Sequence, residues 1–103
     1  MLPKENIQSL AILIPCFNEE GAIGLVVEQV RKRFPGAGVY VYDNNSTDNS
    51  AEEAAQAGAI VRTETCQGKG SVVRRMFADV EAQTYLMIDG DMTYDIGSAS
   101  LLL

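Results

Sequence analysis

Two carboxylates near the end of the chain have the residue types and spacing of a cation site. The apolar run 85–88 is typical of a buried strand, and Asp89, Gly90 and Asp91 follow it directly. Two like charges this close gain most when a cation neutralises them. Mg²⁺ and Mn²⁺ prefer oxygen ligands, and Mg²⁺ usually combines one or two carboxylates with the phosphates of its substrate. The pair therefore predicts a divalent-metal site for a phosphate or diphosphate, although short acidic pairs also occur in many solvated turns.

The stretch 43–48 is a second polar cluster, and its residue types favour turns and helix caps. Asp43 comes directly after an apolar run and could accept a hydrogen bond from the imide N–H of a nucleobase. The alternative is that the cluster only caps the helix that follows it, a task suited to Ser46, Thr47 or Asp48. We expect Thr47 or Asp48 to act mainly as a cap and Asp43 to bind a ligand.

Two further residues could contact a bound nucleotide. Phe17 lies past the end of the first apolar run, so its ring could pack in the core or against a base. Lys69 lies between two glycines at the expected start of a helix, where an ammonium could touch a phosphate or simply be solvated. Cys16 is expected to be a small, semi-buried residue at a strand end, since no base is available to activate its thiol.

Composition narrows the classes of protein that fit these residues. The chain has 103 residues and no histidine, which excludes Ser-His-Asp catalysis and histidine zinc sites. The net charge of −6 and the lack of a basic block argue against nucleic acid as a partner. No signal peptide and no transmembrane segment is recognisable. The two cysteines have no CxxC spacing, so a reducing cytoplasm is the expected location.

Apolar runs and helical periodicities alternate along the chain and must position the polar groups. Strands are expected at 10–14, stopping at Pro15, and at 39–42, 59–61 and 85–88, with helices at about 23–33, 49–57 and 71–80. The order βαβαβαβ predicts an α/β domain with a parallel, Rossmann-like sheet, right-handed crossovers and helices on its faces. Ligands of such sheets bind beyond the carboxyl ends of the strands, where the polar clusters would meet.

The last residues form an apolar stretch, 101–103, which we expect to begin a helix that needs a partner. Residues 1–103 are therefore expected to be the first part of a larger domain, incomplete at its C-terminus. The same apolar tail favours self-association.

Four motifs in this order resemble the nucleotide-binding part of family 2 glycosyltransferases, which have the GT-A fold. The motifs are ILIPCFNEE at 12–20, VYDNNSTD at 41–48, GKG at 68–70 and DGD at 89–91. The resemblance extends over nearly the whole chain and is closest to polyprenyl-phosphate, dolichol-phosphate mannose synthase-like members. One departure is clear: the family's usual second acid and glycine after the second strand are Asn44 and Asn45 here.

The resemblance implies a pocket for a nucleotide-diphospho-sugar. Asp43 would bind the base, and the other residues lining the nucleotide would be Pro15, Phe17, Glu19 and Lys69. Asp89 and Asp91, with Gly90 between them, would form the DxD motif that holds the diphosphate through Mn²⁺ or Mg²⁺. Asp91 is the expected direct ligand, while Asp89 would be a second ligand or a contact to the ribose.

The same resemblance implies transfer of the sugar to an acceptor with inversion at the anomeric carbon. The acceptor would be a polyprenyl phosphate at the cytoplasmic face of a membrane. The catalytic base and the acceptor-binding half would lie beyond Leu103, so the isolated chain is expected to be inactive as a transferase.

Two alternatives remain open on the sequence alone. A sugar-phosphate nucleotidyltransferase would need a glycine- and arginine-rich loop after the first strand, which residues 15–18 do not provide. A non-enzymatic receiver-type signalling domain would need a lysine after a late strand, whereas Lys69 precedes the fourth strand.

Overall fold

Strands and helices alternate along the chain as the sequence predicts. The computed structural model describes residues 8–88 and 100–102, with side chains described for residues 10–88. The elements are β1 Gln8–Cys16, α1 Ile23–Arg33, β2 Gly38–Asp43, α2 Ser50–Gln56, β3 Ile60–Thr63, α3 Lys69–Asp79, β4 Ala82–Met87 and β5 Ser100–Leu102. The predicted site residues Asp89, Gly90 and Asp91 lie outside the described residues.

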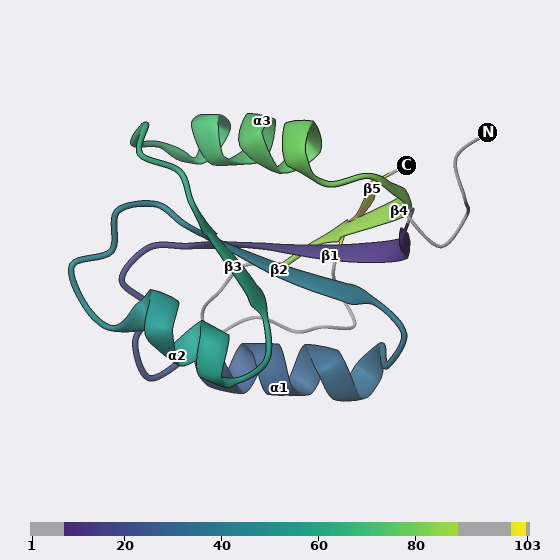
Figure 1. Cartoon of the computed structure of the whole chain (residues 1–103), viewed down its shortest axis with the longest axis horizontal. Coiled ribbons are helices and arrows are strands. Elements are labelled where there is room, and N and C mark those ends of the chain that lie inside the picture. Colours follow the sequence, from purple (N-terminus) through teal and green to yellow (C-terminus); the bar gives the residue numbers. More distant parts are fainter. Residues whose placement is uncertain (1–7, 89–99, 103) are drawn as a thin grey trace.

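All of the described strands belong to one sheet, in the order β3-β2-β1-β4-β5 (Figure 1). The strands β1 to β4 are parallel, and β1 lies between β2 and β4. The chain moves outward from β1 to β3 and then returns to the other side of β1 for β4. The winding therefore reverses between β1 and β4, and open parallel sheets bind their ligands at such a reversal, beyond the carboxyl ends of the strands.

Helices cover both faces of the sheet, with α1 and α2 on one face and α3 on the other (Figure 1). Because side chains of a strand alternate between faces, β1 contributes to two cores. Ile12 and Ile14 belong to the core under α1 and α2, and Ala11 and Leu13 to the core under α3. The predicted apolar face of α1 is buried as Ile23, Val26, Val27 and Val30.

The predicted apolar face of α3 is only partly buried. Val72 and Met76 are buried, but the side chain of Phe77 is 42% exposed. Its ring makes an edge-on contact with Tyr85, with 5.0 Å between the ring centroids. Phe77 follows the buried Met76 directly and is therefore turned to the side of the helix.

β1 continues through Pro15 to Cys16, so the prediction that Pro15 stops the strand was wrong. The carbonyl of Cys16 accepts the N–H of Asn44 from the β2 side, whereas that of Leu13 accepts the N–H of Ile88 from the β4 side. Backbone groups of successive residues alternate in direction, so the nitrogen of Pro15 faces β4. The pairing of β1 with β4 ends at Leu13. Pro15 lies beyond that point, so the N–H that proline lacks does not remove a hydrogen bond between these paired residues.

The stretch 101–103 was predicted to begin a helix, but its described residues, Leu101 and Leu102, belong to the strand β5. β5 runs antiparallel to β4, with Leu101 opposite Leu86 and Leu102 opposite Tyr85. The free edge of β4 offers a row of backbone donors and acceptors that a strand can use and a helix cannot. Three leucines alone do not distinguish the two outcomes, because an apolar run this short has no period to read.

Candidate functional site

Three loops meet at the carboxyl ends of the parallel strands: 17–22 after β1, 44–49 after β2 and 64–68 after β3. Hydrogen bonds between residues 20 or more positions apart hold these loops to one another. This is the edge of the sheet at which the sequence places the ligand site, and most of the predicted residues lie here.

Asp43 lies at the centre of this edge, opposite Cys16 in the register of β1 and β2. The residue is buried, with 6% of its surface exposed. Its Oδ2 accepts the N–H of Ser46 at 3.1 Å, while its Oδ1 is buried and has no hydrogen-bond partner. A buried carboxylate oxygen without a donor costs free energy, so this atom is suited to a ligand that brings an N–H or O–H.

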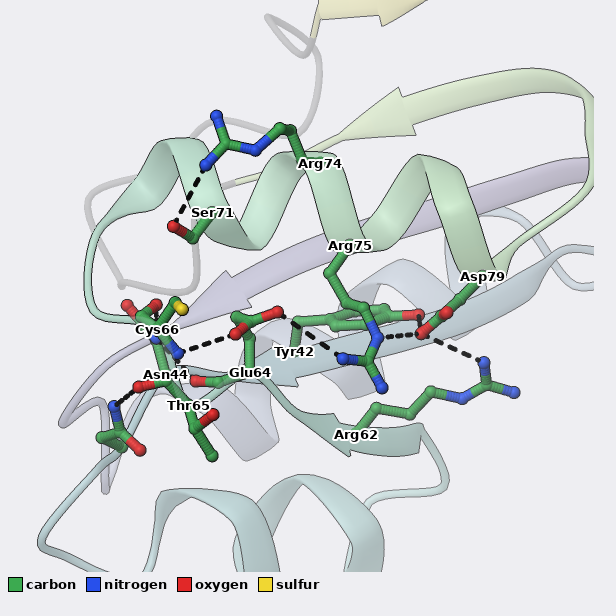
Figure 2. A network of polar contacts seen from close by, with 11 residues as sticks. Tyr42, Asn44, Arg62, Glu64, Thr65, Cys66, Ser71, Arg74, Arg75 and Asp79 are labelled. Carbon is green, nitrogen blue, oxygen red and sulfur yellow. Dashed lines mark hydrogen bonds and ion pairs between the residues drawn. The ribbon is translucent and has the colours of Figure 1, made fainter.

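The next residue, Asn44, ties the loop after β3 to the loop after β2 (Figure 2). Its Nδ2 donates to the carbonyls of Glu64, at 2.7 Å, and Cys66, at 2.9 Å. Its Oδ1 accepts the N–H of Gly68 at 2.9 Å. An amide can donate and accept in this way, whereas the acid that is usual at this place in the family resemblance has no proton to donate when ionised.

The loop after β1 is held mainly by residues of the loop after β2 and of α2. Asn18 has a positive φ of 53°; its N–H donates to Ser46 Oγ at 2.9 Å, and its Oδ1 accepts the N–H of Thr47 at 2.8 Å. The N–H of Glu19 donates to Oγ of the fully buried Ser50 at 2.7 Å. These contacts fix the backbone next to Phe17, whose side chain is 48% exposed past the end of β1.

Two carboxylates, Asp48 from the loop after β2 and Glu53 from α2, make further contacts at this edge. Asp48 Oδ1 accepts both the N–H and the hydroxyl of Ser50, the first residue of α2. The N-cap residue of α2 is Asn49, which makes no side-chain capping bond, so neither Thr47 nor Asp48 is the N-cap, and Asp48 contacts the start of the helix from one position earlier. Glu53, from α2, accepts the N–H groups of Gly21 and Gly24 at 2.8 and 2.7 Å. In the first turn of α1, the N–H of Gly24 is thus bonded to a carboxylate of α2, while that of Ile23 bonds to the carbonyl of Glu19.

Cys16 lies at the strand end, as predicted, but it is buried rather than semi-buried. Burial, and secondly the charge of Asp43, raise the pKa of Cys16 to about 11, so the thiol is neutral near pH 7. The nearby hydroxyl of Ser50 opposes part of that shift. Cys16 is therefore a packing residue at the strand end and not a nucleophile.

A second polar network lies between the sheet and α3 (Figure 2). Asp79 accepts hydrogen bonds from Tyr42, at 3.0 Å, and from Arg75, at 2.8 Å, and pairs with Arg62 at 3.6 Å. The bond from Arg75 is the main cause that lowers the pKa of Asp79. Arg75 also pairs with Glu64 at 3.7 Å, so the network joins α3 to the start of the loop after β3.

The structure brings several predicted residues together and leaves others outside its description. Those at the carboxyl edge are Pro15, Phe17, Glu19, Asp43 and Lys69, the last as the first residue of α3. Asp89 and Asp91 follow β4, the strand beside β1, but their own structure is not described. The sequence did not indicate the role of Asn44, Ser50 and Glu53, whose side chains connect separate segments of this edge by hydrogen bonds.

Comparisons with known proteins identify the family. The model for glycosyl transferase family 2 matches residues 11–103. The chain belongs to this family. It is 53% identical over 91 residues to the protein RfbJ of Shigella flexneri, covering 88% of this chain and 70% of that protein. It is 38% identical over 96 residues to the glycosyltransferase AglJ of Haloferax volcanii, covering 92% of this chain and 31% of AglJ.

A solved structure of glucosyl-3-phosphoglycerate synthase from Mycobacterium tuberculosis, in complex with Mn²⁺, uridine diphosphate and phosphoglyceric acid, shares the fold. The TM-score is 0.75 and the identity 26%, and the match covers 85% of this chain and 34% of that one. The predicted Rossmann-like GT-A fold is therefore confirmed. This chain spans about a third of the length of AglJ and of the synthase, and about two thirds of RfbJ.

Family membership also decides between the alternatives that the sequence left open. Neither a sugar-phosphate nucleotidyltransferase nor a receiver-type signalling domain fits a match to glycosyl transferase family 2 over residues 11–103. In the described part of the chain, no helix is long and apolar enough to cross a membrane.

Proposed function

We propose that this chain forms the donor-binding part of a glycosyltransferase that uses a nucleotide-diphospho-sugar. The observation that carries the proposal is Asp43 Oδ1, a buried acceptor without a partner at the carboxyl edge of the sheet. The exposed ring of Phe17 lies on the loop beside it, where it can pack against a base.

The hydrogen-bonding chemistry of Asp43 favours one class of base. A carboxylate oxygen can only accept, so its partner on the ligand must donate. Uracil and guanine carry an imide-type N–H on the edge that pairs with other bases. Cytosine and adenine carry an amino donor there, but beside it lies a bare ring nitrogen that would face the carboxylate with no proton between them. We therefore propose uridine or guanosine diphosphate sugars as donors, which agrees with the uridine diphosphate in the structure of the mycobacterial synthase.

Asp89 and Asp91 are the proposed ligands of a divalent cation. Among the described residues, no three His, Cys, Asp or Glu side chains gather to hold a metal. Asp89 and Asp91 are a closely spaced acidic pair that follows β4, the strand beside β1. Two oxygen donors suit Mg²⁺ or Mn²⁺, which take further ligands from substrate phosphates. Such a cation would neutralise the charge that develops on the departing diphosphate.

The remaining parts of the reaction rest on the family resemblance. We propose that Pro15 and Glu19 line the nucleotide and that Lys69 approaches its phosphates. The acceptor would be a polyprenyl phosphate at a membrane surface, and transfer would invert the anomeric carbon. No residue of this chain is assigned as the catalytic base, and the isolated chain should bind the donor without transferring the sugar.

Calorimetric titration of the chain with UDP, GDP, CDP and ADP in the presence of Mn²⁺ tests this function. UDP or GDP should bind more tightly than CDP or ADP. Asp43→Asn should weaken that binding about tenfold, the equivalent of ~1.4 kcal/mol for a lost charged hydrogen bond. Asp91→Ala should weaken binding only when Mn²⁺ is present.

Asp48→Asn is the matched control, because it changes a carboxylate of the same loop that has no proposed contact with the base. The proposal fails if no nucleoside diphosphate binds to the folded wild-type chain. It also fails if Asp43→Asn and Asp48→Asn change the affinity for UDP and GDP equally.

A further inference from the structure

The loop between β3 and α3 is exposed, yet it carries the backbone into the helix that begins at Lys69. Residues 65–70 are all exposed to solvent. An open surface pocket of about 270 Å³ is lined both by this loop, at Glu64 and Cys66, and by α3, at Ser71, Arg74 and Arg75. Burial of apolar side chains therefore contributes little to fixing the conformation of this loop, which must depend on polar contacts.

Asn44 supplies most of these contacts through one side chain. Its Nδ2 uses both protons, on the carbonyls of Glu64 and Cys66. Its Oδ1 accepts from the N–H of Gly68 and, at 3.3 Å, from the side chain of Gln67. Carbonyls only accept and a backbone N–H only donates, so these contacts also fix which way the amide points. Asn44 is buried, with 5% of the residue exposed.

We propose that Asn44 is a positioning residue, which holds the start of α3 and thereby sets the place of Lys69 relative to Asp43. The inference rests on the proposed function, in which Asp43 binds the base and Lys69 approaches the phosphates. Asn44 follows Asp43 in the chain and Gly68 precedes Lys69, so the 2.9 Å bond from Gly68 to Asn44 links the two ligand-binding residues through their direct neighbours.

The conformation of Gly68 strengthens this link. Gly68 is the N-cap residue of α3 and has a φ of +116°, which residues with a side chain rarely adopt. Its carbonyl accepts the N–H groups of Ser71 and Val72, which open the helix. A displacement of Gly68 would therefore move the first turn of α3, with Lys69 in it.

Asn44→Asp is the sharpest perturbation, because it keeps the shape of the side chain and removes both donated protons. The carboxylate could still accept from Gly68 but would face two carbonyl oxygens with no proton between them. Asn45→Asp is the matched control: the exposed Asn45 donates to the carbonyl of Thr65 and to the side chain of Gln67, and it is not bonded to Gly68. Asn44→Ser, which retains a single donor, replaces the aspartate variant if that variant does not fold.

Hydrogen exchange measured by NMR tests the positioning without any ligand. The amide of Gly68 should exchange about tenfold faster in Asn44→Asp than in the wild type, since two hydrogen bonds no longer oppose opening of the loop. The control Asn45→Asp should leave that rate within about twofold. Amides of Ile12 and Ile14 in β1 should be unchanged in both variants, which shows that the fold persists.

Calorimetry with UDP or GDP, whichever the wild type binds, tests the link to Lys69. Asn44→Asp should weaken binding roughly tenfold in the wild-type background, the equivalent of ~1.4 kcal/mol. In a Lys69→Met background the same substitution should change the affinity by less than about twofold, because the contact that it misplaces is already absent.

The outcomes separate this inference from the proposed function. Unchanged exchange at Gly68, or equal losses of affinity in the wild-type and Lys69→Met backgrounds, would overturn the positioning role of Asn44 and leave the donor site intact. Failure of the wild type to bind either nucleotide would overturn the proposed function, and the role of Asn44 towards a ligand with it.

Discussion

The bridge from Glu53 to the start of α1 allows a quantitative test of how the site is held together. The carboxylate of Glu53 accepts the N–H groups of Gly21 and Gly24 at 2.8 and 2.7 Å. Ala22, the N-cap residue of α1, makes no side-chain capping bond, and no acidic residue lies in the first turn of α1. Glu53 therefore acts as the cap of a helix to which it does not belong, and Glu53→Ala removes that cap.

The expected cost follows from the two bonds. Gly21 is exposed, so its N–H regains water when Glu53 is truncated, whereas Gly24 is partly buried and its N–H is left poorly solvated. An unsatisfied partly buried donor costs about 1–2 kcal/mol, and the lost interaction between a carboxylate and a helix N-terminus adds about 0.3–1 kcal/mol. We expect Glu53→Ala to lower the free energy of unfolding by about 2 kcal/mol, or the Tm by about 10 °C for a chain of this size.

Urea denaturation and thermal unfolding, followed by circular dichroism, measure this cost. The control is Glu52→Ala, since Glu52 is exposed and shares the first turn of α2 with Glu53. Glu52→Ala also removes one negative charge from the start of α2, but it removes no contact with α1. It should lower the free energy of unfolding by less than about 0.5 kcal/mol. Equal losses for the two variants would refute the bridge, because the effect would then belong to α2 alone.

Gly24 gives an independent check of the same bridge. A Cβ added there would lie 3.0 Å from Cγ and Oε2 of Glu53. Alanine inside a helix is normally favoured over glycine by about 1 kcal/mol. Gly24→Ala should therefore give less than this gain in the wild type, and the full gain when Glu53 is already alanine.

The remaining predictions concern Gly58, in the turn after α2, and the two cysteines. Gly58→Ala should destabilise the chain by at least about 1 kcal/mol, since Gly58 has a φ of +107° and its Cβ would lie 2.3 Å from Nη1 of Arg31; thermal unfolding should show no such loss for Gly36→Ala, where nothing lies within 4 Å. Burial raises the pKa of Cys16 from 9.0 to about 11, so the unfolded chain loses this proton first and stability should decline from about pH 9 towards pH 11. Cys16→Ala should flatten that decline in urea titrations, and iodoacetamide at pH 8 should modify the exposed Cys66 and spare Cys16 as long as the chain is folded.

Much of the fold was predictable because local pattern and tertiary environment agree in it. The apolar run that became β1 is buried on both faces, as the central strand of a parallel sheet must be, and the helical spacing from Ile23 to Val30 is the buried stripe of α1. The ends of elements were harder. Pro15 was tolerated because its nitrogen faces a side of β1 where pairing has ended, and β5 formed because β4 has an edge to fill. Neither fact is local to the residues concerned.

The sequence suggests a candidate residue where its type and its place at a strand end are enough, and it does not reveal residues that act through contacts with one another. Asp43 stood out as an acid at the end of a strand, and the structure leaves one of its buried oxygens without a partner. Asn44, Ser50 and Glu53 act through contacts to residues 20 to 32 positions away. Their side chains look like ordinary turn and helix residues in the sequence, and the one available signal was the departure of Asn44 from the acid usual in the family.

The arrangement of helix ends also bears on how this chain could hold a diphosphate. Parallel α/β domains often bind phosphate at the N-terminus of the first helix, where backbone N–H groups and the helix dipole attract an anion. Here the carboxylate of Glu53, from α2, already bonds to backbone N–H groups at the start of α1. The chain as a whole carries a charge of −6. A diphosphate at this edge must therefore be attracted by other groups, and the sequence supplies Lys69 and a cation at Asp89 and Asp91 as candidates. The contacts of Glu53 thus make the proposed dependence on a divalent metal stronger, because they occupy backbone N–H groups at the start of α1 that could otherwise bind the diphosphate.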